Sequence, residues 1–228
     1  MKVVVSVGGS VLAPDLEPDR VADYATVLQD LDDRGHTLAT VVGGGPTARE
    51  YIGTARELGA NEIELDQLGI AVTRLNGRLL IAALDDRAAP TPAESYESGR
   101  EAIRRGDIPV LGGVVAAQTT DAVAAAFAEY VDADLLVYAT SVPGVFDADP
   151  NEDADATRFD SLGADELVDI IAGMEMDAGS NAPVDLLAAK VIKRSGIRAV
   201  VLDGTDPERV ARAVADDEFD GTEIRPGA

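Results

Sequence analysis

The segment Thr37-Leu38-Ala39-Thr40-Val41-Val42-Gly43-Gly44-Gly45-Pro46-Thr47 decides the fold, because a strand pattern runs through three glycines directly into a helix. Residues 37–42 are a short apolar run without regular polar alternation, which is typical of a strand buried on both faces of a largely parallel sheet. Pro46 suits the first position of a helix, and Gly59 marks its end. The glycines expose backbone N–H groups and the helix adds its positive end, so this turn predicts a phosphate cradle.

Two further glycine clusters follow predicted strands. Residues 3–7 lead into Gly8-Gly9-Ser10, and residues 108–111 lead into Gly112-Gly113, with Thr119-Thr120-Asp121 a few residues further on. In a parallel sheet, the turns that follow the strands lie at the carboxyl edge, where ligands bind. One such cluster is often no more than a tight turn. Three along one edge indicate two phosphorylated ligands held face to face.

Strands alternate with helices along the rest of the chain. Further strands are predicted at residues 135–139 and 199–202, and the helices are predicted at residues 21–34, 46–58, 62–75, 92–105, 121–131 and 182–194, with a last one opened by Thr205-Asp206-Pro207. This order predicts an α/β fold, a three-layer αβα sandwich with a largely parallel central sheet. We expect a single domain over residues 1–228, with the acidic stretch 147–155 as a surface loop or hairpin.

The charge balance excludes several classes of partner. The 228 residues include 42 Asp and Glu but only 19 Lys and Arg, a net charge of −23. Such a surface repels nucleic acid and anionic lipid, so neither a nucleic-acid nor a membrane partner is expected. No apolar run approaches the roughly 20 residues that span a bilayer, and no export signal is recognisable, so a cytoplasmic location is the expectation. An acidic, lysine-poor surface also suggests adaptation to high salt.

Arg49 and Asp121 are the candidate charged residues of the site. Arg49 lies one turn into the helix after Gly45, so its guanidinium can point back over the cradle; the alternative is an ordinary surface arginine. Asp121 begins the helix after the third cluster, where a carboxylate can orient a cation or Mg²⁺, or simply complement the helix dipole. His36 is the one histidine of the sequence; it lies at the end of a predicted helix, and we expect it to have a structural role. A histidine-based acid–base mechanism is therefore not expected.

The ordered series of motifs resembles the amino-acid-kinase superfamily, most closely its archaeal uridylate (UMP) kinases. No single motif is decisive, but the series is specific and covers essentially the whole chain. The motifs are Gly8-Gly9-Ser10, residues 42–45 with 48–52, residues 68–70 with 73–76, Gly112-Gly113 with 119–124, residues 139–146 with 148–150, and residues 187–192 with 194–197.

This resemblance implies transfer of the γ-phosphoryl group of ATP to UMP in pyrimidine nucleotide biosynthesis, giving UDP and ADP, with Mg²⁺ accompanying ATP and no metal site of the protein's own. It implies an acceptor-binding half over about residues 1–130 and an ATP-binding half over about residues 131–228. The implied ATP-binding residues are Gly9, Ser10, Gly45, Arg49, Thr140, Phe146 and Asp149. The implied UMP-binding residues are Gly44, Asp66, Val114, Val115, Ala116, Ala117, Gln118, Thr119 and Thr120. The catalytic candidates are Asp121, Arg49 and Lys190.

The family resemblance further implies a homohexamer built from dimers, with the helix that starts at Glu62 in the dimer contact. Three features depart from the family pattern. Ser6 stands where many superfamily members carry a lysine, which leaves Lys190, Arg49 or Mg²⁺ alone as the main transition-state cation. Phe146 replaces a tyrosine, and the loop 114–118 is less polar than in relatives.

Two other functions stay open on the sequence. The same fold could use another acceptor, such as carbamate, acetylglutamate, aspartate or isopentenyl phosphate. The chain could also be a non-catalytic, oligomeric binding or storage protein.

Overall fold

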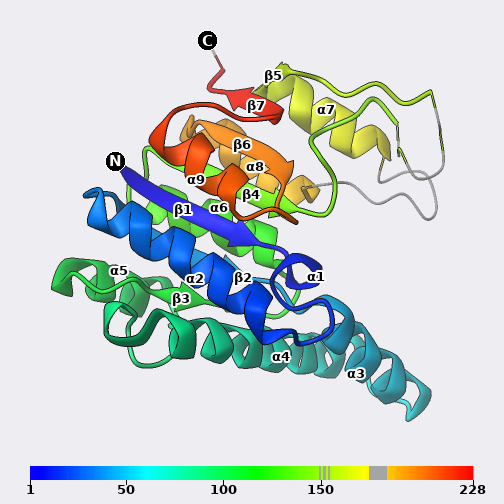
Figure 1. The fold of residues 1–228 in the computed structure, drawn as a ribbon. Coiled ribbons are helices and arrows are strands. Elements are labelled where there is room, and N and C mark those ends of the chain that lie inside the picture. The colour runs from blue at the N-terminus through cyan, green and yellow to red at the C-terminus, as the bar shows by residue number, and fades with distance from the viewer. Residues whose placement is uncertain (149, 151–152, 154, 175–183, 228) are drawn as a thin grey trace.

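A seven-stranded sheet forms the middle layer of the molecule (Figure 1). The computed structural model describes residues 1–148, 150, 153, 155–174 and 184–227. The strand order is β3-β2-β1-β4-β6-β7-β5. Every neighbouring pair is parallel except β6 with β7, so the largely parallel sheet predicted from the sequence is confirmed. The strands are β1 (Lys2–Val7), β2 (Thr37–Val42), β3 (Val110–Leu111), β4 (Leu135–Thr140), β5 (Ser161–Gly163), β6 (Ala199–Asp203) and β7 (Gly221–Arg225).

Helices cover both faces of this sheet, as the three-layer prediction requires (Figure 1). They are α1 (Gly9–Leu12), α2 (Pro18–Asp33), α3 (Gly45–Glu57), α4 (Glu62–Leu84), α5 (Tyr96–Arg105), α6 (Thr120–Tyr130), α7 (Ala164–Met174), α8 (Leu186–Ser195) and α9 (Glu208–Ala215), with a 3₁₀ turn at Asp85–Arg87. Among the described residues, no helix combines the length and the apolar character needed to cross a membrane.

Two hydrophobic cores lie on opposite faces of the sheet. Val3, Val5 and Val7 of β1 pack with α2, α9 and the end of α4, whereas Val4 packs with α6, α7 and α8. This split follows from strand geometry, because successive side chains point to opposite faces. Both sides of β1 are therefore apolar, which explains why its sequence shows no polar alternation.

Helix α4 is longer than the sequence pattern indicates. It continues nine residues past Leu75, to Leu84. A capping box opens it: Asn61 Oδ1 accepts from the Glu64 N–H at 3.1 Å, and Glu64 Oε2 accepts from the Asn61 N–H at 2.8 Å. By contrast, α5 begins later than predicted, at Tyr96, because Ser95 and not a residue near Pro92 provides the N-cap.

The strand register brings the glycine turns to one edge. Val7, the last residue of β1, is paired with Val42 of β2 and with Ala139 of β4. The hydrogen-bonded pairing extends one residue into each turn. The Gly43 N–H donates to the Val7 carbonyl at 2.9 Å, and the Gly8 N–H donates to the Ala139 carbonyl at 3.0 Å. All the turns expected to bind phosphate therefore leave the sheet side by side.

Candidate active site

The turns after β1 and β2 touch backbone against backbone. A Cβ atom on Gly9 would lie 2.1 Å from the Gly45 nitrogen, and one on Gly45 would lie 2.5 Å from the Gly9 carbonyl carbon. Gly45 also has a φ of +64°, in the region that favours glycine. The two turns form one surface of exposed backbone, which we call the glycine wall (Gly8, Gly9 and Gly43–Gly45). Gly9, Gly43 and Gly45 are required by close backbone contact and not merely by turn formation.

Two side chains of α4 hold the glycine wall and the turn after β3. The Asn76 amide donates to the carbonyl oxygens of Gly43 and Gly44, at 2.9 and 3.2 Å. One turn earlier, the Thr73 hydroxyl accepts from the Gly113 N–H at 2.8 Å and donates to the Ile70 carbonyl at 2.7 Å. Both side chains are buried. Sequence reasoning assigned them no role, although polar residues spaced i, i+3 on the apolar face of a helix were a usable signal.

Two pockets meet at this wall. The first has a volume of about 490 Å³ and the second about 580 Å³, and Gly44, Gly45, Arg49 and Thr120 line both. The rest of the first pocket comes from Ala48, Ile52, Asp66, Gly69, Ile70, Thr73, Gly113, Ala117, Gln118 and Thr119. The rest of the second comes from Ser6, Gly8, Gly9, Ser10, Val11, Gly43, Asp121, Ala139, Thr140, Ser141 and Val142. Of the residues expected to bind the acceptor, Asp66 and Thr119 line only the first pocket, and of those expected to bind the ATP phosphates, Gly9 and Ser10 line only the second.

Arg49 lines both pockets. It stands in the first turns of α3, and its Nη2 donates to the Ser10 hydroxyl at 3.3 Å. A guanidinium here can contact anionic oxygens from either pocket, because it presents several donors in a planar fork. Its placement fits stabilisation of charge that crosses from one pocket to the other.

Asp121 lies at the floor of the second pocket with a strongly perturbed carboxyl group. The pKa of this carboxyl group is raised from 3.8 to about 7, mainly by burial and also by the negative charge of Asp185, while a hydrogen bond from Ser6 acts in the opposite direction. The Ser6 hydroxyl is 3.5 Å from Asp121 Oδ1. Tyr138 donates to the Asp121 backbone carbonyl at 3.0 Å, which fixes the start of α6. Ser6 thus contacts the proposed organising carboxylate from the strand position where a lysine was expected.

Asp185, which sequence reasoning missed, links the two halves of the site. It accepts from the Ala188 N–H at 2.9 Å as the N-cap of α8, and its other oxygen accepts a hydrogen bond from the Thr119 hydroxyl. An acidic residue just before an apolar helical run was the signal for the cap. Lys190 is exposed on the same helix and lines an adjoining pocket of about 370 Å³ with Ala117, Thr119 and Asp185. It therefore stands beside the first pocket and not among the residues that line the second.

Asp66 shapes the loop that follows the third glycine cluster. Its Oδ2 accepts from the Ala117 N–H at 2.8 Å, and Ala117 has a φ of +64°. Within this described loop, Ala117, Gln118, Thr119 and Thr120 line the first pocket, whereas Val114, Val115 and Ala116 do not. The three residues that do not line the cavity are all apolar.

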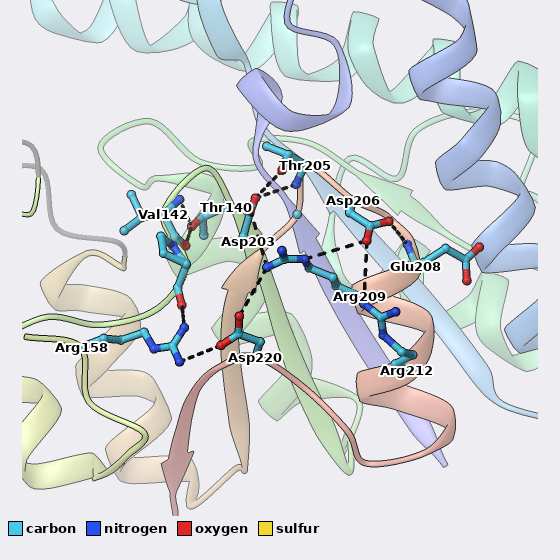
Figure 2. Close-up of polar contacts among 12 residues, drawn as sticks. Thr140, Val142, Arg158, Asp203, Thr205, Asp206, Glu208, Arg209, Arg212 and Asp220 are labelled. Carbon is cyan, nitrogen blue, oxygen red and sulfur yellow. Dashed lines mark hydrogen bonds and ion pairs between the residues drawn. The ribbon is translucent and has the colours of Figure 1, made fainter.

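Thr140 and Phe146, two of the residues expected to hold adenosine, lie at the end of β4 and on the turn that follows it. The Thr140 hydroxyl accepts from the Val142 N–H at 3.0 Å and donates to its carbonyl at 2.8 Å, so this side chain shapes its own turn (Figure 2). Phe146 is half-buried and forms an antiparallel bridge with Arg158. Asp149 lies outside the described residues.

Two adjoining pockets that share a glycine wall and an arginine, at the carboxyl edge of a mostly parallel sheet, define a phosphotransferase that brings two substrates together. The chain belongs to the amino acid kinase family, whose model matches residues 1–203.

Its relatives bear out the resemblance seen in the sequence. The chain is 85% identical over 228 residues to the uridylate kinase of Haloarcula marismortui, covering 100% of both chains. It is 68% identical over 226 residues to the uridylate kinase of Halobacterium salinarum, covering 99% of this chain and 94% of that one. The crystal structure of uridylate kinase from Archaeoglobus fulgidus superposes with a TM-score of 0.89 at 42% identity, covering 98% of this chain and 100% of that one.

Proposed function

We propose that this chain is a uridylate kinase, which transfers the γ-phosphoryl group of ATP to UMP and releases UDP and ADP. The observation that carries this is the pair of pockets that share Gly44, Gly45 and Arg49. Two substrates bound on either side of this wall have their phosphates head to head. The full-length similarity to uridylate kinases supports UMP as the acceptor.

ATP occupies the second pocket in this proposal. Its phosphates lie on Gly9, Ser10, Gly45 and Arg49, and its adenosine lies on the turn that carries Thr140 and Phe146, together with Asp149. UMP occupies the first pocket, with Gly44 at its phosphate and with Asp66 and the loop 114–120 at its nucleoside. The side-chain amide of Gln118 and the hydroxyl of Thr120, two residues that line this pocket, are suited to hydrogen-bond a neutral sugar and base.

The reaction requires positioning and charge stabilisation more than proton transfer. The attacking group is an oxygen of the UMP phosphate, which is already ionised near neutral pH, so no strong general base is needed. The glycine wall holds donor and acceptor in line, which removes much of the entropic cost of bringing them together. Arg49 is placed to stabilise the charge as it passes between the pockets, and Lys190 in the adjoining pocket is the second candidate cation.

Magnesium fits this site as an ion carried by ATP. Among the described residues, no group of three or more His, Cys, Asp or Glu side chains is arranged to hold a metal ion. Mg²⁺ at phosphates needs only one or two protein carboxylates, and Asp121 is the carboxylate that lines the second pocket. Bound there with ATP, the ion would offset the negative charge of the transferring phosphoryl group.

A homohexamer built from dimers is part of the proposal. Helix α4 carries Leu75 and Leu79 with 58% and 42% of their surface exposed, and Leu58 at the end of α3 is 83% exposed. Large apolar side chains gathered on one pair of helices are suited to a contact between subunits. We further propose one domain over residues 1–228, with its acceptor half and its ATP half meeting near residue 130, and a cytoplasmic, high-salt environment.

A coupled assay of ADP release in molar KCl tests the function. UMP, CMP, carbamate and isopentenyl phosphate are compared at equal concentration with ATP and Mg²⁺. We expect release with UMP above all the others, because the chain is similar over its full length to uridylate kinases, and the Asp66 carboxylate in the acceptor pocket additionally repels carbamate. No release with any acceptor would refute the enzyme, and a clear preference for another acceptor would refute the substrate.

A further inference from the structure

A buried threonine of β7 holds the turn that follows β4. The Thr222 hydroxyl accepts from the Val145 N–H at 2.9 Å and donates to the Phe159 carbonyl at 2.5 Å. Thr222 is fully buried, as is Val145. This strand lies beyond residues 1–203, the part of the chain that the family model matches.

The segment that Thr222 holds continues directly from the wall of the second pocket. Thr140, Ser141 and Val142 line that pocket, and Val145 follows three residues later. Val145 and Phe159 lie at one end of the short antiparallel pairing centred on Phe146 and Arg158, and the Phe159 N–H donates to the Val145 carbonyl at 2.9 Å. The Thr222 hydroxyl is hydrogen-bonded to both Val145 and Phe159. It therefore sets the distance between β7 and the turn that forms the pocket wall.

Arg158 holds the same turn from a second side (Figure 2). Its Nη1 donates to the Pro143 carbonyl at 3.3 Å, and its Nη2 lies 2.7 Å from Asp220 Oδ1. Asp220 also lies 3.9 Å from Arg209, which lies 3.7 Å from Asp203 at the end of β6. This chain of alternating charges ties the turn to the end of the neighbouring strand.

The space under Gly144 is filled by these two residues. A Cβ atom on Gly144 would lie 2.6 Å from Thr222 Oγ1 and 2.8 Å from Arg158 Cδ. The backbone of the turn therefore rests directly on both side chains. Neither side chain is among the residues that line the second pocket.

We propose that Thr222 is a positioning residue for ATP, with Arg158 as its second support. By holding residues 143–146 against β7, the two side chains set where the turn after β4 meets the nucleotide, without contacting the nucleotide themselves. This inference rests on the assignment of the second pocket to ATP. It predicts a defect confined to ATP, because the acceptor pocket is built from α3, α4 and the loop 113–120.

Thr222→Val tests the proposal, because valine keeps the shape and removes both hydrogen bonds. We expect the dissociation constant of ATP, measured by calorimetry without acceptor, to rise about tenfold, because the turn that meets ATP loses both hydrogen bonds from Thr222. KM for ATP should rise in parallel, while KM for UMP stays within about twofold of wild type. Thr222→Ser keeps the hydroxyl and should restore ATP binding.

Thr40→Val is the matched control. Thr40 is also fully buried in a strand, but its hydroxyl has no hydrogen-bond partner among the described residues. The same change of atoms should therefore leave ATP binding unchanged. If Thr222→Val does not fold, Arg158→Met tests the support of the same turn. Because Arg158 is half-exposed, this variant should fold, and it should also weaken ATP binding selectively.

The outcomes separate this proposal from the proposed function. A folded Thr222→Val protein with wild-type affinity for ATP overturns the proposal, as does an equal loss of ATP and UMP binding, which would indicate a general structural role. A wild-type protein that binds ATP but does not phosphorylate UMP refutes the acceptor, yet selective weakening of ATP binding in Thr222→Val would still support the positioning role.

Discussion

The side-chain amide of Asn76 donates a 2.9 Å hydrogen bond to the carbonyl oxygen of Gly43, 33 residues earlier in the chain. A second bond, at 3.2 Å, goes to Gly44. The long helix α4 therefore holds the surface at which the two substrates are proposed to meet. A backbone wall has no side chains with which to fix its own position, so its geometry depends on such supports.

Replacing Asn76 by alanine should slow turnover more than it weakens either substrate. The two carbonyls lose their buried donor, so the wall can shift and the in-line arrangement is lost. We expect kcat to fall by about tenfold or more and the free energy of unfolding to fall by about 1 to 3 kcal/mol. Steady-state kinetics and urea unfolding measure both. Arg78→Ala, an exposed change on the same helix, is the control and should alter neither.

Gly9→Ala should abolish activity, because its methyl group would lie 2.1 Å from the Gly45 nitrogen. The turns must separate to accept it, and such overpacking costs about 1 to 3 kcal/mol. Gly53→Ala is the matched control: Gly53 lies inside α3, and nothing lies within 4 Å of an added Cβ. That change should raise the unfolding free energy by about 0.5 to 1 kcal/mol and keep activity. An active Gly9→Ala enzyme would contradict the contact.

Arg49 should contribute more to catalysis than Lys190. Arg49 lines both pockets, whereas Lys190 lines the adjoining one. We expect Arg49→Ala to lower kcat/KM about a hundredfold and Lys190→Ala to lower it less than about tenfold. Arg56→Ala, on the same helix as Arg49 and paired at 3.1 Å with Glu62, should have little effect. The reverse order would make Lys190 the main transition-state cation.

The pH profile should report the carboxyl group of Asp121. Burial raises its pKa to about 7, so activity that needs the carboxylate should rise between about pH 6 and pH 8. Ser6→Ala removes the hydrogen bond that lowers the pKa of Asp121, so the rise in activity should move to higher pH. Asp185→Asn keeps an N-cap but removes a negative charge near Asp121, so the rise in activity should move to lower pH. Shifts in the same direction would contradict the arrangement.

The same group makes a prediction for stability. The folded pKa of Asp121 lies above its ordinary value of 3.8, so the folded state binds the proton more tightly than the unfolded state. Its contribution to the free energy of unfolding should therefore fall as the pH rises from about 4 to about 7 and then stay constant. Asp121→Asn should flatten this part of the profile in chemical denaturation at constant salt.

The net charge of −23 should make the folded state dependent on salt. Raising KCl from about 0.1 M to about 1 M shortens the Debye length from about 10 Å to about 3 Å, which screens repulsion between the acidic side chains. We expect the melting temperature to rise by several degrees. A neutral osmolyte at equal osmolality is the control and should stabilise less. A protein that melts no lower in dilute buffer would contradict salt adaptation.

Local patterns were enough to predict the central strands and their glycine turns. Residues 3–7 and 37–42 are apolar on both faces. The glycines, Pro46 and the N-cap Thr119 influence only the conformation of residues close to them in the sequence. Strands β5 and β7 were missed, because three and five residues of mixed character carry no periodic signal and form through pairing with distant segments.

The sequence alone therefore determined the αβα architecture, the family and the sheet edge at which the glycine turns meet, since these depend on local propensity and on the order of strands. Only the tertiary structure decided which side chains support the site. Asn76, Asp185 and Thr222 act on residues 33, 66 and 77 positions away. Long-range contacts of this kind arise only when strands pair and helices pack. The sequence around a buried polar residue can indicate that its side chain needs a hydrogen-bond partner, but it does not identify that partner.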